Sequence, residues 1–180
     1  MYNVFFGERK AHYASIKMVF IQLYVLTAVV CAFGNGVIPA ILSYACLPYG
    51  PTTYHLATEL SLLANPISCF IAFFVACKSP LLLDALGGVA VLIASTILYI
   101  ATLSPDPWLV GTTAGSFLIV GLCVAWTATI SYIKVCIASV LQKYGENALL
   151  WCGVVTQLGS CCGAVVIFIV NFKTNAFTQC

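Results

Sequence analysis

Five long apolar stretches occupy most of this 180-residue chain, and its few charged residues fall almost entirely between them. Only 7% of the residues are charged, 62% are hydrophobic, and the mean hydropathy is +1.07. A soluble domain of this composition has too little polar surface to cover its apolar residues. The chain is therefore predicted to be a multi-spanning membrane protein whose main surroundings are the lipid bilayer.

Each stretch is longer than the roughly 20 residues that an α-helix needs to cross about 30 Å of hydrocarbon. Strands of a membrane barrel are only about 10 residues long and alternate in polarity, which these stretches do not. A continuous apolar segment in lipid satisfies its backbone hydrogen bonds internally as a helix. We therefore expect an all-α fold, a five-helix transmembrane bundle with helices at about 17–44, 54–77, 81–103, 108–141 and 148–171.

Short connections separate the stretches and contain glycine, proline or charged residues, at 46–51, 78–80, 103–107 and 142–146. Residues of these types end helices and form turns. Because the connections are short, neighbouring helices are expected to be antiparallel. The sequence thus predicts a single transmembrane domain over residues 17–171, with a lead segment at 1–16 and a tail at 172–180.

Basic residues indicate the orientation in the membrane. Arg9, Lys10 and Lys17 precede the first helix, and Lys78 and Lys143 lie in the two connections on the same side. Short loops rich in lysine and arginine stay cytoplasmic, so we expect a cytoplasmic N-terminus and an extracellular C-terminus. The lead segment is too polar for the apolar core of a signal peptide. No further basic patch is present, so nucleic acid is not an expected partner.

Most of the ten cysteines fall within the predicted spans, where cysteine acts as a small packing residue. Cys46 and Cys180 are predicted outside them, which leaves a disulfide between these two open. No cysteine and histidine spacing is typical of a metal site. Neither paired carboxylates nor a nucleophile beside a base is evident, so the sequence predicts neither a metal site nor an enzyme.

Glycines within the predicted helices are candidate points of close helix contact, because small residues let helix backbones approach each other in lipid. The candidates are Gly87 with Gly88, Gly111 with Gly115, and Gly159 with Gly163. This spacing is common in membrane helices and predicts packing more than function.

Polar residues at membrane depth carry more information, because each one costs free energy unless it faces protein or water. Asn35 lies between two glycines and shortly before Pro39, so the first helix is predicted to be kinked or locally unwound there. On the second helix, polar side chains share one face, at Thr58, Ser61, Asn65 and Ser68. These groups either hydrogen-bond to each other inside the bundle or line a cavity for a polar solute.

Two ionisable residues within the spans have alternative interpretations. Lys134 lies about two turns from the cytoplasmic end of its helix, within reach of lipid headgroups by snorkelling. Glu59 lies off the polar face of the second helix, and it is either a residue near the outer headgroups or a proton-coupled carboxylate. Both are therefore candidates for ion coupling.

A series of short motifs runs along the chain: GNGVIPA at 34–40, CLPYG at 46–50, YHLA at 54–57, ANP at 64–66, LSP at 103–105, SYIKV at 131–135, ALLWCG at 148–153 and QLGS at 157–160. In this order and spacing, over about residues 17–168, the motifs resemble the animal riboflavin transporter family. Members of that family have 11 transmembrane helices in an arrangement similar to major-facilitator and equilibrative nucleoside carriers. The resemblance implies that this chain corresponds to the C-terminal half, helices 7 to 11.

The resemblance also implies a function, which is uptake of riboflavin across the plasma membrane by alternating access, together with an N-terminal six-helix half. Riboflavin is then the transported substrate, and no cofactor is implied. An alternative is a non-transporting membrane subunit that pairs with another chain through the same polar face.

Riboflavin has a flat tricyclic ring with an imide edge and a hydroxylated ribityl chain, so its site needs an aromatic or apolar slot with amide and hydroxyl partners. The residues expected to hydrogen-bond the vitamin are Asn35, Asn65 and Gln157. The residues expected to line its path are Ser131, Tyr132 and Ser160.

Overall fold

The computed structural model describes residues 2–104, 107 and 109–174, with side chains described from residue 17 to residue 173 within those ranges. Every regular element in these ranges is helical. In chain order the elements are α1 (Tyr2–Cys31), η1 (Ala32–Val37), α2 (Ile38–Cys46), η2 (Leu47–Tyr49), α3 (Pro51–Phe74), α4 (Pro80–Thr102), α5 (Thr113–Gln142) and α6 (Glu146–Thr174).

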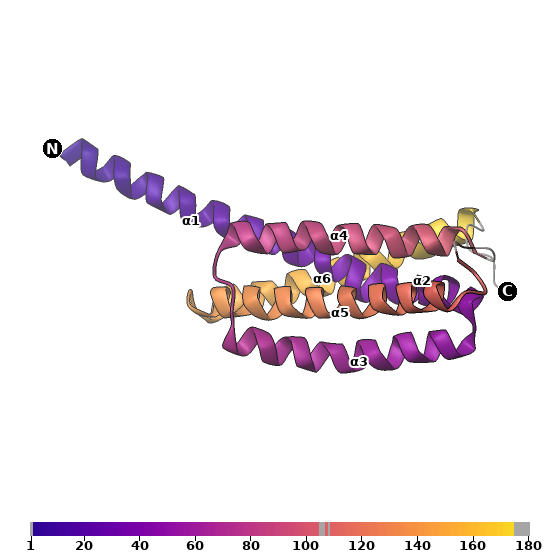
Figure 1. Cartoon of the computed structure of the whole chain (residues 1–180). Coiled ribbons are helices and arrows are strands. Elements are labelled where there is room, and N and C mark those ends of the chain that lie inside the picture. The colour runs from indigo at the N-terminus through magenta and orange to yellow at the C-terminus, as the bar shows by residue number, and fades with distance from the viewer. Residues whose placement is uncertain (1, 105–106, 108, 175–180) are drawn as a thin grey trace.

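Five helical segments are long and apolar enough to cross a membrane, namely Lys17–Tyr49, Pro51–Phe74, Pro80–Thr102, Thr113–Gln142 and Glu146–Lys173. The prediction of an all-α protein with five spans is therefore confirmed. The first span continues from α1 through η1, α2 and η2 without a loop, and the helix itself begins at Tyr2. Figure 1 shows the N-terminal part of α1 projecting beyond the other helices, so the lead segment is a helical extension of the first span.

The fourth span begins later than the sequence suggested, at Thr113, because the preceding residues form turns. Leu109 and Gly111 have positive φ angles of 60° and 77°, which are incompatible with a right-handed helix. Thr112 then caps α5, since its hydroxyl accepts a hydrogen bond from the backbone N–H of Gly115 at 3.2 Å. A side-chain cap of this kind satisfies one of the free N–H groups at a helix start.

The first span is irregular at its centre, where η1 is a π-helical turn. The N–H of Ile38 donates to the carbonyl of Phe33, five residues back. Pro39 follows at the start of α2 and has no N–H with which to continue an α-helical pattern. The predicted irregularity around Asn35 is thus confirmed, and it takes the form of a wider turn, a feature often found at functional sites.

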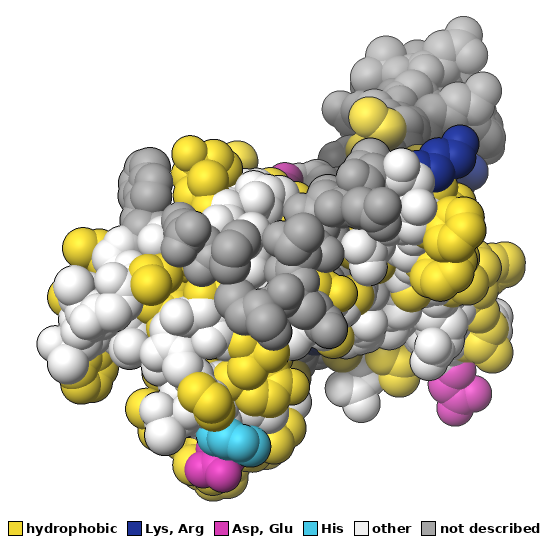
Figure 2. All heavy atoms as spheres, turned by 90° about the vertical axis from the view of Figure 1, so that its right-hand side faces the viewer, with side chains coloured by type: hydrophobic (Ala, Val, Ile, Leu, Met, Phe, Trp, Pro, Cys, Tyr) yellow, Lys and Arg dark blue, Asp and Glu magenta, His cyan; other side chains and the backbone are white. Residues whose placement is uncertain are grey.

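The first span packs against α6 through α1 and η1, and against α4 through α1 and α2. Helix α3 lies along α5, α4 packs on α2 and α5, and α6 packs on α1 and η1. In Figure 1, α4, α5 and α3 lie roughly parallel, and α6 passes behind them. Most of the fully buried side chains are aliphatic, as at Leu23, Ile41 and Ile133, and several cysteines are buried with them. Many large apolar side chains are also exposed, as expected where lipid is the solvent, and Figure 2 shows several groups of them on the face seen from one end of the bundle.

Close backbone contact joins α6 to the first span through glycines. A Cβ atom at Gly159 would lie 2.5 Å from the carbonyl oxygen of Ala28, and one at Gly163 would lie 2.2 Å from that of Ala32. Both distances are far below van der Waals contact, so only glycine fits at these positions. The predicted contact at Gly159 and Gly163 is therefore confirmed.

The other glycine predictions fare unequally. A Cβ atom at Gly87 would lie 2.4 Å from Leu26, and one at Gly115 would lie 2.5 Å from the carbonyl oxygen of Leu109, so these glycines also lie in tight contacts. A Cβ atom at Gly88 or Gly111 would meet nothing within 4 Å. The prediction was wrong for these two residues, because Gly88 lies on an exposed face of α4 and Gly111 in an exposed turn.

The cysteines in the described ranges are free thiols. Cys46 is fully buried at the end of α2, within the first span, and not outside the spans as predicted. Its possible disulfide partner, Cys180, lies outside the described residues.

Candidate ligand-binding pocket

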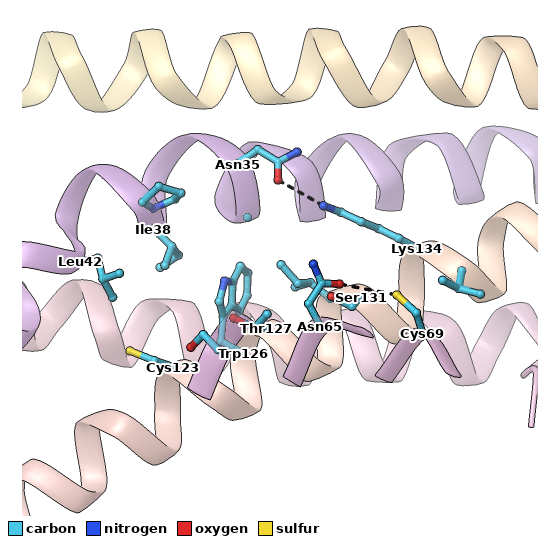
Figure 3. Close-up of a pocket in the computed structure, with 15 residues that line it drawn as sticks. Asn35, Ile38, Leu42, Asn65, Cys69, Cys123, Trp126, Thr127, Ser131 and Lys134 are labelled. Carbon is cyan, nitrogen blue, oxygen red and sulfur yellow. Dashed lines mark hydrogen bonds between the residues drawn. The ribbon is translucent and has the colours of Figure 1, made fainter. Parts of the chain in front are cut away.

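A cavity of about 350 Å³ lies between the first span, α3 and α5. Its volume is within the range of about 300–1,000 Å³ that is usual for small-molecule sites. Asn35 and Asn65 face it from two different spans, and each lies near the middle of its span (Figure 3). Its other polar lining residues are Ser61, Cys69, Thr127, Ser131 and Lys134. Its apolar lining includes Ile38, Pro39, Leu42, Trp126, Ile130 and Val135.

The π-helical turn positions Asn35 between α5 and α6. The amide Nδ2 of Asn35 donates to the Oγ of Ser160 at 3.0 Å, and Oδ1 accepts from the Nζ of Lys134 at 3.3 Å. Ser160 in turn donates to the carbonyl of Thr156 at 2.8 Å. A chain of hydrogen bonds therefore connects α5, η1 and α6 near the middle of the predicted membrane-spanning region.

Gly34 allows η1 to lie close against α5. A Cβ atom at Gly34 would be 2.8 Å from the Cδ1 of Ile130 and 3.8 Å from the Nζ of Lys134. A larger residue would push against the wall that carries the lysine. The small residue before Asn35 thus keeps the amide within reach of Lys134.

Lys134 points into the cavity and not along its helix toward the headgroups (Figure 3). The structure therefore disagrees with the interpretation of Lys134 as a snorkelling residue. No carboxylate is among the described residues that line the cavity. The ammonium group thus faces the cavity with a neutral amide oxygen as its acceptor.

Asn65 contributes the second amide, from α3. Its Oδ1 accepts a hydrogen bond from the Sγ of Cys69 at 3.6 Å, one turn further along the helix. Figure 3 shows the amide nitrogen of Asn65 directed toward the space below Asn35. Ser61 lines the cavity from the same helix face.

The predicted polar face of α3 is only partly used by the cavity. Ser61 and Asn65 line it, whereas Ser68 is buried outside the lining set. Thr58 donates to the carbonyl of Tyr54 at 2.9 Å and so bonds to its own helix. Polar residues on one helix face therefore divide between internal hydrogen bonding and the cavity, and both interpretations of the sequence hold in part.

The structure does not bring Gln157, Tyr132 or Glu59 into the cavity. Gln157 is exposed on α6, which packs behind η1 through Gly159 and Gly163, so the first span stands between this helix and the cavity. The hydroxyl of Tyr132 donates to the carbonyl of Val75 at 2.6 Å, which satisfies a free carbonyl just past the end of α3.

Glu59 is exposed on α3 and is not part of the lining. Ser160 is also outside the lining but holds Asn35, and Ser131 lines the cavity as expected. Of the two residues expected for ion coupling, only Lys134 therefore contacts the cavity.

A polar contact that the sequence reasoning missed lies between α1 and α4. The Nε2 of Gln22 donates to the Oδ2 of Asp84. Both residues lie within predicted spans, so their polarity at membrane depth was a signal that they need a partner. Trp126 and Cys69 were also missed as lining residues, because apolar residues on a membrane helix give no indication of which face is covered.

The cavity differs in polarity between its two ends. Lys134, Asn35 and Asn65 lie toward one end, whereas Ile38 and Leu42 lie toward the other (Figure 3). Trp126 lies between them on α5 and is only 3% exposed. Such a cavity suits a flat, partly polar ligand that lies lengthwise along it.

Fold and cavity together define a polytopic membrane protein with a polar pocket at membrane depth. A family model described as solute carrier family 52, riboflavin transporter, matches residues 6–179. The chain belongs to this family, which is a family of transporters.

Individual relatives agree with the family assignment. The chain is 43% identical over 159 residues to solute carrier family 52, riboflavin transporter, member 3-B of Danio rerio, which is 88% of this chain and 35% of the relative. It is 45% identical over 143 residues to member 2 of Homo sapiens (79% of this chain, 32% of the relative) and 40% identical over 150 residues to the human member 3 (83% and 32%). The chain spans about a third of the length of these relatives. No solved structure matches it, so the likeness to half of a major-facilitator fold stays a prediction.

Proposed function

We propose that this chain is part of a plasma-membrane riboflavin transporter and contributes the cavity between the first span, α3 and α5 to the riboflavin site. The relatives that carry this substrate in their names are 40% to 45% identical to the chain. The observation that carries the proposal is the convergence of Asn35 and Asn65, from two spans, on one cavity near mid-membrane. An ionisable residue at that depth, such as Lys134 in the same cavity, is by default a candidate for a functional site.

The chemistry of the cavity fits the vitamin. The tricyclic ring offers two large apolar faces, and the apolar part of the lining, which includes Pro39, Leu42 and an edge of Trp126, can contact them. The two carbonyl oxygens of the imide edge accept hydrogen bonds, and Asn65 and Lys134 can donate them. Ser131 and Thr127 add hydroxyl groups on the α5 wall.

We propose that further transmembrane helices of the same transporter cover the open side of the cavity. Asn35 and Asn65 are both exposed in the described chain, although each lies near the middle of a span. Lipid does not satisfy exposed amides, so another protein surface or a water-filled path has to face them. Rocking of the two parts about the cavity would open it to either side in turn.

Riboflavin binding tests the proposal directly. The purified chain in lipid nanodiscs is titrated with riboflavin while flavin fluorescence is recorded. We expect saturable quenching, because Trp126 lies in the wall of the cavity and would be close to a bound flavin ring. Asn65→Ala should weaken binding about tenfold, which corresponds to the loss of one buried hydrogen bond.

Asn147→Ala is the matched control, since Asn147 is exposed in the first turn of α6 outside the cavity. It should leave the affinity unchanged. Quenching that does not saturate, or equal loss in both variants, would contradict the proposed site. Riboflavin flux into liposomes, measured with the chain alone, should remain at background, because alternating access needs the covering helices.

A further inference from the structure

The polar end of the cavity presents mainly donors. Asn35 uses both ends of its amide, with Nδ2 bonded to Ser160 and Oδ1 accepting from Lys134. The Oδ1 of Asn65 accepts from Cys69, and its Nδ2 has no acceptor within the part of the chain that the structure describes. Both amide oxygens are thus engaged, whereas an amide N–H group of Asn65 faces the cavity.

Lys134 adds further donors at the same end. An ammonium group carries three N–H bonds and no acceptor. Among the described residues it has one hydrogen-bond acceptor, the Oδ1 of Asn35 at 3.3 Å, which is long for an N–H···O bond. Two N–H bonds therefore remain for a ligand. A cation at this depth is costly to leave without acceptors, so an acceptor in the cavity gains from this group.

We propose that Lys134 determines specificity in this cavity by donating to the carbonyl edge of a flat heteroaromatic ligand. This inference rests on the proposed function. It places the imide edge of riboflavin, with its two carbonyl groups (the dione edge), at the end of the cavity with Lys134 and Asn65. Carbonyl oxygens are acceptors, so they match the donors on these two side chains. A ligand whose same edge lacks strong acceptors is rejected, because the buried donors are left unpaired.

The opposite end of the cavity fixes the direction of the ligand. Ile38 and Leu42 on α2 and Cys123 on α5 offer no strong hydrogen-bonding group. The hydrocarbon edge of the ring, which carries two methyl groups, belongs there. Because Lys134 lies about two turns from the end of α5 at Gln142, the dione edge points toward the side that carries the α5–α6 connection.

Riboflavin analogues with sulfur in place of one carbonyl oxygen test the assignment. The sulfur atom lies at nearly the same place as the oxygen but is a weaker hydrogen-bond acceptor. The 2-thio and 4-thio analogues compete with riboflavin for the chain in nanodiscs, and flavin fluorescence is the readout. At least one analogue should bind about tenfold more weakly than riboflavin to the unmodified chain, because it loses a charge-assisted hydrogen bond.

Lys134→Met connects the loss to the lysine. In this variant riboflavin itself should bind about tenfold more weakly, because the donor is gone. The sulfur penalty, which is the ratio of the riboflavin affinity to that of the weaker analogue, should fall to about twofold or less. Lys143→Met, which removes an exposed lysine just past the end of α5, should retain both the affinity and the full sulfur penalty.

The outcomes separate this inference from the proposed function. If riboflavin binds to the unmodified chain and both sulfur analogues bind as tightly as riboflavin, the role of Lys134 is overturned and the riboflavin site stands. That comparison needs no variant, so it holds even where Lys134→Met does not fold. An undiminished sulfur penalty in a folded Lys134→Met variant also overturns it. Absence of riboflavin binding overturns both.

Discussion

At the scale of single residues, Asn35 is the centre of the polar network. It is the hydrogen-bond acceptor of Lys134 and a donor to Ser160, and these three residues come from three different spans. A neutral amide in this position has two roles, because it holds the lysine side chain within the cavity and ties η1 to α6. Its removal affects the fold as well as the binding of a ligand.

Asn35→Ala should therefore destabilise the protein by about 1–3 kcal/mol, the usual cost of leaving a partly buried donor without an acceptor. Adding Lys134→Met to this variant should restore part of the loss, because the ammonium group that lost its acceptor is then absent. Thermal unfolding in detergent, followed by circular dichroism, is measured for the unmodified protein, the two single variants and the double variant. Strictly additive changes in the two single variants would mean that Asn35 and Lys134 are not coupled.

At the scale of helices, the contact between α6 and the first span depends on glycine. A Cβ atom at Gly163 would lie 2.2 Å from the carbonyl oxygen of Ala32, which is backbone and cannot rotate away. The same contact decides which residues reach the cavity. Because α6 lies directly against η1, Ser160 reaches Asn35, whereas Gln157 on the same helix is exposed.

Gly163→Ala should force α6 away from η1 and cost about 1–3 kcal/mol, as for overpacked positions in protein cores. Gly153→Ala is the control in the same helix, since a Cβ atom there would meet nothing within 4 Å. It should keep or slightly raise stability, because alanine favours a helix more than glycine does. Unfolding midpoints in the same detergent compare the two. Equal midpoints for both variants would show that the close contact does not form.

At the scale of the whole molecule, we expect the two ends of the chain to lie on opposite sides of the membrane, because five helices are long and apolar enough to cross it. The lysines between α3 and α4 and between α5 and α6 lie on the side of the N-terminus, at Lys78 and Lys143. We expect this side to be cytoplasmic. The polar end of the cavity, with Lys134, then lies nearer the cytoplasm than its apolar end.

Glycosylation tags test the orientation. An acceptor sequence added after Cys180 should be glycosylated in microsomes, and the same sequence added before Met1 should not, because only the luminal side carries the transferase. Gel mobility before and after glycosidase treatment gives the result. Modification at the N-terminal tag alone would reverse the orientation, and modification at both tags would contradict five spans.

The class of fold follows from the sequence alone, because apolar stretches of this length have one stable form in lipid. The sequence also located the irregular turn at Asn35, since proline and glycine act on the local backbone. Even the start of α6 is local, because Gly145 has a φ of 109° just before it.

The set of polar residues that share a cavity depends on how the helices pack against each other. Asn35, Asn65, Ser131 and Lys134 meet there, whereas Gln157, Tyr132 and Glu59 lie elsewhere. The periodicity of a helix gives the face on which a side chain lies, but it does not say which neighbour that face meets. That choice depends on contacts between distant segments, such as Gly163 against Ala32, and on the rotation of each helix that these contacts impose.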